Sequence, residues 1–194
     1  VVGRSLPDSD PVHQVTIIPR GRAGGFTMSL PKEDRYYATK KGMFNDIVEL
    51  LGGRVAESII IGDISTGASN DIQRVTEIAR GMVTKYGMSD TLGPITFGSG
   101  ETEVFLGKDY STVRNYSEEI AKDIDEEIRK IVTHGYKRCE EILRANIDKL
   151  HLLADYLIAN EKIDGEDFVK LMEGEIVPPV TLCENEENNE TTEE

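Results

Sequence analysis

The segment of this sequence best suited to chemistry is a run of small residues that ends in an acid. Residues 65–71 read Ser-Thr-Gly-Ala-Ser-Asn-Asp, and a stretch with helical spacing of apolar residues follows. A carboxylate at the start of a helix, with small side chains around it, leaves room for a metal ion or a substrate, and carboxylate oxygens bind zinc. The same acid also suits a plain turn, because the helix dipole favours negative charge in the first turn. Asp71 is therefore a candidate metal ligand with a structural alternative.

The other signatures of catalytic and metal sites are missing from the sequence. It contains no HExxH, CxxC, P-loop or G-x-S-x-G motif, each of which sets functional groups at a fixed spacing. His13, His134 and His151 lie far apart, and none has a second histidine four residues away. Two histidines at that spacing share one helix face and can bind one zinc ion. We therefore expect no complete active site among these residues.

Hydrophobic periodicity predicts a helix on each side of the Ser65–Asp71 segment. Apolar residues recur at steps of three and four over residues 39–61, which predicts one helix, although a Gly-Gly pair inside it weakens its helix propensity. The same spacing predicts a second helix over residues 70–86. Asp71 is thus expected in the first turn of the second helix.

The rest of the chain predicts further helices and a little sheet. The remaining elements are three helices, over residues 117–143, 147–160 and 165–172, and two β-branched strands, over residues 12–18 and 26–30. Ser117 suits the N-cap of the longest helix, and Cys139 lies on its apolar stripe, where a small buried thiol is expected. The fold class that we expect is mainly α with a small β-sheet.

The charge balance limits the partners of this chain. The formal net charge is −14 at pH 7, and a strongly acidic surface repels nucleic-acid phosphates and anionic lipid headgroups. No apolar run approaches the about 20 residues that a membrane-spanning helix needs. We therefore expect a soluble chain that does not bind nucleic acid.

The two ends of the sequence carry separate expectations. Residues 183–194 are acidic and polar, with too little apolar surface to offset the entropy of ordering them, so we expect this tail to be disordered. The sequence starts at Val1 rather than at a methionine, and Val-Val-Gly-Arg reads like the end of an element already under way. This start predicts a fragment of a longer protein.

Several motifs, in the same order, resemble those of the FtsH-type ATP-dependent zinc metalloproteases. Residues 10–22, Asp-Pro-Val-His-Gln-Val-Thr-Ile-Ile-Pro-Arg-Gly-Arg, resemble the segment that follows the HExxH helix of that family. Further matches are GGRxAE at residues 52–57, STGASNDI at residues 65–72, MVxxxGMS at residues 82–89, and Val-Phe-Leu-Gly at residues 104–107. The resemblance extends over residues 1–179.

The resemblance implies a helical FtsH-type peptidase domain over residues 1–182, truncated on its N-terminal side. In that family two histidines of HExxH and the aspartate of STGASNDI, here Asp71, bind zinc, and the glutamate of HExxH is the general base. The HExxH histidines and base are absent from this sequence, so we expect the isolated chain to be inactive.

The resemblance also implies supporting roles for two other segments. Glu57 becomes a candidate acid that supports the metal site without touching the metal; its alternative is a solvated or helix-packing acid. The residues Phe26, Thr27 and Met28 resemble the strand on which the family's substrates lie in extended form, by strand addition. Ordinary sheet structure is the alternative for this strand.

For the whole protein, the resemblance implies partners that these residues do not contain. They are an AAA+ module that binds ATP, a homohexamer, unfolded or membrane protein substrates, and membrane association with the peptidase domain on the cytoplasmic side in bacteria. A second hypothesis is a non-catalytic helical module for assembly or partner binding, and a third is a fragment without a role of its own. An HExxH motif before Val1 in the gene decides for the enzyme.

Overall fold

The computed structural model describes residues 1–19, 21, 24–31, 37–98 and 116–176. It divides into two compact units, one formed by residues 1–11 and 30–147 and the other by residues 12–29 and 148–194. The described part is mainly helical with one three-stranded sheet, so the expected fold class is confirmed. The Val-Phe-Leu-Gly match at 104–107 and the acidic tail at 183–194 lie outside the described residues.

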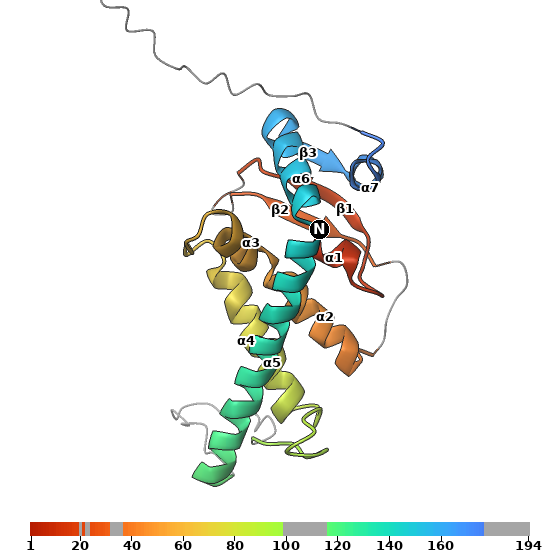
Figure 1. The fold of residues 1–194 in the computed structure, drawn as a ribbon. Helices are drawn as coiled ribbons and strands as arrows, with labels where there is room; N and C mark the ends of the chain where they lie inside the picture. The colour runs from red at the N-terminus through yellow and green to blue at the C-terminus, as the bar shows by residue number, and fades with distance from the viewer. Residues whose placement is uncertain (20, 22–23, 32–36, 99–115, 177–194) are drawn as a thin grey trace, which may run out of the picture. The chain divides into compact units, whose positions relative to one another are not determined.

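Helices form the first unit, and the longest of them packs against the other four. The elements are α1 (Val2–Ser5), α2 (Lys40–Leu50), α3 (Gly52–Ile60), α4 (Ser69–Thr84) and α5 (Glu118–Ala145). Helix α5 contacts α1, α2, α3 and α4, and α2 also contacts α4 (Figure 1). The core between them consists of fully buried side chains, including Ile47, Leu51, Val55, Val75, Val83, Ile124 and Leu143.

The expectation of a single helix over residues 39–61 is wrong. The chain forms α2 and α3, which are separated at Leu51, where φ is −74° and ψ is −10°. Gly52 and Gly53 follow directly, and glycine in a helix costs about 1 kcal/mol relative to alanine, so the helix breaks most easily here. The buried Leu51 side chain, 1% exposed, holds the bend in the core.

Helix α5 matches its sequence prediction closely. The Ser117 hydroxyl accepts a hydrogen bond from the Ile120 N–H at 3.3 Å, so the predicted N-cap is confirmed. Cys139 is fully buried, as predicted, and burial raises the pKa of its thiol to about 12. A thiol that stays protonated is a poor nucleophile and metal ligand, so Cys139 is a packing residue.

The second unit is a small sheet with two helices. Its strands are β1 (Val12–Thr16), β2 (Phe26–Ser29) and β3 (Lys162–Asp164), all antiparallel in the order β2-β1-β3, and its helices are α6 (Ile147–Asn160) and α7 (Gly165–Glu173). The core of this unit contains Ile163, Phe168 and Leu171, each at most 2% exposed. Strand β3 was not predicted from the sequence, because an alternating pattern cannot be recognised in only three residues.

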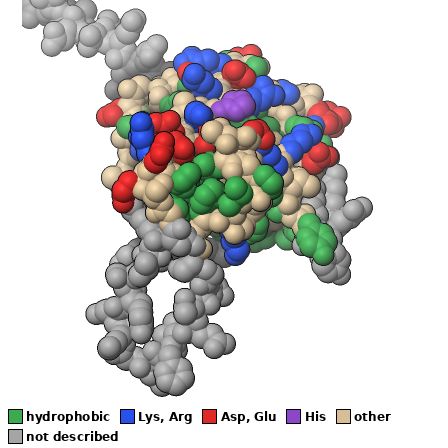
Figure 2. Space-filling model, turned by 90° about the horizontal axis from the view of Figure 1, so that it is seen from below, with side chains coloured by type: hydrophobic (Ala, Val, Ile, Leu, Met, Phe, Trp, Pro, Cys, Tyr) green, Lys and Arg blue, Asp and Glu red, His purple; other side chains and the backbone are tan. Residues whose placement is uncertain are grey.

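The surface of the described part mixes charges of both signs. On the face shown in Figure 2, hydrophobic side chains gather near the centre and again at the lower right, with acidic and basic side chains interspersed around them. Among the described helices, none is both long enough and apolar enough to cross a membrane.

Candidate functional site

Asp71 lies in the first turn of α4, as the sequence predicts. The helix begins at Ser69, and the Ala68 N-cap is 7% exposed and offers no side-chain hydrogen bond to the helix end. One turn further on, Val75 is fully buried in the core of the first unit. The packed start of α4 therefore fixes the backbone at Asp71, while its side chain remains partly accessible to a ligand.

The carboxylate of Glu57, on α3, binds the loop that leads to Asp71. Its Oε1 accepts a hydrogen bond from the Ser65 hydroxyl at 2.6 Å, and its Oε2 accepts one from the Ser65 N–H at 3.1 Å. These two bonds, above all the one from the hydroxyl, lower the pKa of Glu57, and Arg54 adds to the effect. Glu57 is therefore ionised at neutral pH and holds Ser65 through a charged group.

Two more contacts complete the attachment of this loop. Arg54, also on α3, donates from Nη1 to the Ser65 carbonyl oxygen at 3.0 Å. The Ser65 hydroxyl in turn accepts a hydrogen bond from the Gly67 N–H at 3.1 Å. The GGRxAE and STGASNDI segments, which are separate in sequence, thus meet at Ser65.

The described residues do not complete a metal site. Among them, no three His, Cys, Asp or Glu side chains lie close enough together to hold a metal ion. A catalytic zinc ion takes three protein ligands and keeps one position open for water. Asp71 can supply one carboxylate ligand of that kind, and a three-ligand site that includes it would need at least one ligand from outside the described residues.

In the second unit, the backbone pattern of β1 shows which way each strand residue faces. Bonding direction alternates along an antiparallel strand. The Ile17 N–H donates to the Glu161 carbonyl oxygen at 2.9 Å, so the backbone groups of Ile17 and, two residues earlier, of Val15 face β3. Those of Gln14 and Thr16 therefore face β2.

Strand β2 consequently keeps an open edge within the described sheet. Gln14 pairs with Met28 and Thr16 pairs with Phe26, so Phe26 and Met28 direct their backbone groups toward β1. Thr27 lies between them and directs its N–H and C=O to the opposite side. An extended peptide can add as a further strand at such an edge.

Comparison with known proteins identifies the family. The model of peptidase family M41 matches residues 1–171. The chain belongs to peptidase family M41.

Relatives of this M41 chain carry the name that the motifs suggest. It is 59% identical to ATP-dependent zinc metalloprotease FtsH 1 of Thermoanaerobacter sp. (strain X514). The match extends over 183 residues, which are 94% of the chain and 30% of the relative. It is 60% identical to FtsH of Caldicellulosiruptor bescii, over 89% of the chain and 28% of the relative. It is 48% identical to FtsH of Bacillus subtilis (strain 168), over 98% of the chain and 30% of the relative. The chain thus spans less than a third of the length of these relatives.

The M41 chain also contains a polar cluster that the sequence did not reveal. Glu127 of α5 has a side chain only 11% exposed, and its carboxylate accepts hydrogen bonds from Ser89 Oγ at 2.8 Å and from Thr91 Oγ1 at 2.9 Å. Lys130 Nζ lies 2.8 Å from the same carboxylate. Glu127 sits among the alternating acids of a long amphipathic helix, so its spacing alone gave no sign of a buried partner. The cluster fixes the turn after α4 to α5.

Proposed function

We propose that this chain is part of the proteolytic domain of an ATP-dependent zinc metalloendopeptidase, and that Asp71 is one of its zinc ligands. The observation that carries the proposal is the placement of Asp71 within the M41 match. It lies in the first turn of a packed helix, after a loop of small residues that α3 holds in place.

Zinc supplies the chemistry of such a site by lowering the pKa of a bound water toward about 7. The residues of this chain have supporting tasks. Asp71 supplies a carboxylate oxygen, and Glu57 supports the site by holding the loop before it rather than by binding the metal.

The same proposal gives β2 a role in binding substrate. An unfolded protein in extended form adds to the edge at Phe26, Thr27 and Met28, where main-chain hydrogen bonds do not depend on side-chain identity. The exposed Met28 side chain, 40% accessible, adds an apolar contact. Binding of this kind suits a peptidase that degrades many unfolded or membrane proteins.

For the whole protein, the proposal includes the partners that the family resemblance implies. ATP is bound by an AAA+ module, the protein assembles as a homohexamer, and it is associated with a membrane, with the peptidase domain on the cytoplasmic side in bacteria. Each of these features depends on residues outside this chain.

The test is Asp71→Asn in the protein that carries these residues together with an HExxH segment. Asparagine keeps the size of the side chain, but a neutral amide is a much poorer zinc ligand than a carboxylate. We expect nearly complete loss of casein cleavage and of bound zinc, measured by metal analysis, with ATP hydrolysis unchanged.

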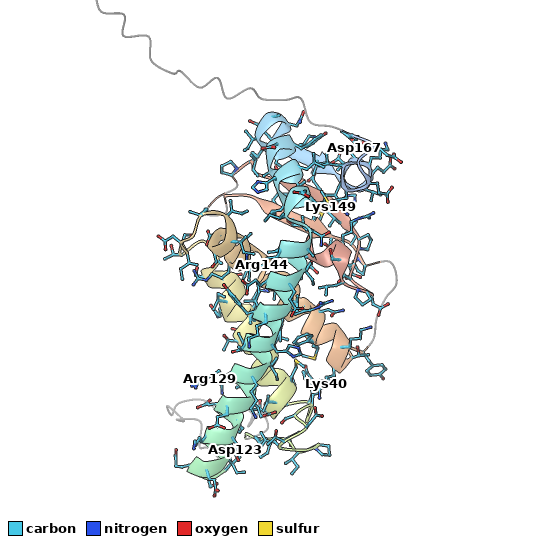
Figure 3. The ribbon with its side chains drawn as sticks, in the orientation of Figure 1. Lys40, Asp123, Arg129, Arg144, Lys149 and Asp167 are labelled. Carbon is cyan, nitrogen blue, oxygen red and sulfur yellow. The ribbon has the colours of Figure 1, made fainter. Side chains whose placement is uncertain are left out.

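A matched control separates metal binding from the helix dipole. Asp167, labelled in Figure 3, is also a first-turn acid, on α7, and Asp167→Asn should leave both zinc and activity intact. Normal zinc content and cleavage in Asp71→Asn would leave Asp71 as a simple helix-start acid. That result would favour the second hypothesis, a non-catalytic helical module. Absence of an HExxH motif from the gene would favour the same hypothesis independently.

A further inference from the structure

All the backbone and side-chain polar groups of Ser65 are bound by neighbours. Its O–H and N–H donate to the two oxygens of Glu57, at 2.6 and 3.1 Å, and its carbonyl oxygen accepts from Arg54 at 3.0 Å. Its hydroxyl oxygen also accepts the Gly67 N–H at 3.1 Å. An exposed loop serine can satisfy these groups with water, so such complete engagement marks Ser65 as the point where the loop is fixed.

We propose that Arg54 and Ser65 are positioning residues for Asp71, and that they act together with Glu57 as a latch between α3 and the loop before α4. We call these three residues the Ser65 latch. The inference rests on the proposed function, because it gives the latch the task of setting where the metal-binding carboxylate lies relative to α3.

The anchor side of the latch is rigid. Arg54 and Glu57 are three residues apart, so they lie on the same face of α3. Between them, Val55 is fully buried in the core of the first unit. Both arms of the latch therefore extend from a helix that cannot shift without disturbing the core.

The path from the latch to the ligand is short and also constrained. The Ser69 N–H donates to the Thr66 carbonyl oxygen at 3.1 Å, which forms a turn directly after Ser65. Ala68 is 7% exposed, and the helix with Asp71 in its first turn starts at the next residue. A shift of Ser65 is thus transmitted to Asp71, six residues further on, because the backbone between them is held by the turn and by the buried Ala68.

The contacts of Arg54 and Glu57 with Ser65 are better suited to positioning the loop than to stabilising the fold. Hydrogen bonds on an exposed loop add little to the free energy of unfolding, because water replaces them in the unfolded state. They do restrict where the loop lies, and a metal ligand has to be held within about 0.5 Å of its productive place. Substitutions in the latch should therefore affect metal affinity more than stability.

The first test is a double-mutant cycle between Glu57 and Ser65, in the protein that carries these residues together with an HExxH segment. Zinc affinity is measured by competition with a chromogenic chelator. We expect Glu57→Ala to weaken zinc binding about 10- to 100-fold, the range for residues that orient metal ligands, and Ser65→Ala to weaken it several-fold. The double variant should lose little beyond Glu57→Ala, because Glu57→Ala already removes the hydroxyl bond that Ser65→Ala breaks.

The second test concerns the Arg54 arm. Arg54→Ala should weaken zinc binding and speed amide hydrogen exchange at Ser65 and Gly67. Arg54→Lys should keep much of the zinc affinity and of the protection from exchange, because an ammonium can still donate to the Ser65 carbonyl. Ser58→Ala, a serine on the same helix outside the latch, is the matched control and should leave zinc affinity and exchange unchanged.

The outcomes distinguish this inference from the proposed function. Loss of zinc in Asp71→Asn, with unchanged zinc affinity in Ser65→Ala and Arg54→Ala, would overturn the latch and leave the ligand assignment standing. Additive losses in the double-mutant cycle would also overturn it, because Glu57 would then act on the metal site by a route that bypasses Ser65. Unchanged zinc in Asp71→Asn would reject the ligand assignment and the latch together.

Discussion

At the scale of single residues, Glu127 is the clearest case of a charged side chain that holds part of the fold together. Its carboxylate is nearly buried, and three donors, on Ser89, Thr91 and Lys130, surround it. A carboxylate accepts several hydrogen bonds at once, whereas a carboxamide has to present an NH2 group to one of these donors. The cluster therefore depends on charge as well as on shape.

This charge predicts a pH-dependent stability. The hydrogen bond from Lys130, helped by those from Ser89 and Thr91, lowers the pKa of Glu127 from its ordinary value of 4.5, although burial opposes the shift. A carboxyl group with a lowered pKa in the folded state stabilises the fold fully above pH 4.5, and this contribution is lost as the pH falls through the lowered value. Glu127→Gln should lower the free energy of unfolding by about 2 kcal/mol at pH 7.

Urea unfolding followed by circular dichroism at pH 7 and at pH 3.5 checks this prediction. The difference in unfolding free energy between the unaltered protein and Glu127→Gln should be smaller at pH 3.5. This pH lies below the ordinary pKa of 4.5, so the carboxyl group of the unfolded chain binds a proton and part of the stabilisation is lost. Glu126→Gln, at the exposed neighbouring position, serves as the control and should have little effect. An equal loss of stability at both pH values would show that shape rather than charge matters at this site.

At the scale of elements, the close approach of α2 and α5 depends on a glycine. A Cβ at Gly135 would lie 2.8 Å from Ile47 Cγ2 and 3.4 Å from Leu51 Cδ1. Ile47 is fully buried, and its methyl group sits on the branched carbon, so it cannot swing away as the end of a long side chain can. The two helices therefore pack at a distance that only glycine permits.

Gly135→Ala should accordingly destabilise the protein, although alanine favours a helix. Overpacking costs about 1–3 kcal/mol, and the helix propensity of alanine offsets about 1 kcal/mol of this. We therefore expect the free energy of unfolding, measured with urea, to fall by about 1 kcal/mol. Gly81→Ala on α4 is the matched control. Its Cβ would meet Tyr86 at 3.6 Å, an ordinary contact, so this variant should be neutral or more stable. A stabilised Gly135→Ala would mean that α2 and α5 move apart freely.

The edge of β2 gives a second prediction at the scale of elements. Thr27 directs its N–H away from β1, so proline at this position removes the outward donor without breaking a bond between the strands. In the protein with its HExxH segment, Thr27→Pro should raise KM for casein several-fold and leave the zinc content unchanged. Thr27→Val keeps the N–H and should behave like the unaltered protein. Equal KM values for the two variants would remove the substrate role of β2.

At the scale of the whole molecule, the missing ligands predict an inactive chain. These 194 residues contain no HExxH motif, and their described part holds no group of three metal ligands. A single carboxylate binds zinc weakly because it forms no chelate. The isolated chain with added zinc should therefore leave casein intact, and calorimetry should detect no tight complex. Chelator-sensitive cleavage by the purified chain would refute this prediction and require a different site.

The sequence alone determined the family, the fold class and the candidate ligand. Motifs such as STGASNDI are local, so their residues can be read without knowledge of the fold, and the long apolar stripe of α5 predicts a helix whatever it packs against. The position of Asp71 in the first turn of α4 followed for the same reason. The role of Asp71 and the role of β2 remain predictions from resemblance.

Only the tertiary structure decided which distant residues meet. The break at Leu51 divides a segment that periodicity treats as one helix. The addition of β3 to β1, and the contacts of Ser65 with Arg54 and of Ser89 with Glu127, join segments that periodicity treats as separate. Such contacts depend on how several elements pack at once, and a local pattern carries no information about a partner many residues away. For that reason Glu57 read from the sequence as an acid with two possible roles, and the fold showed that its carboxylate holds Ser65.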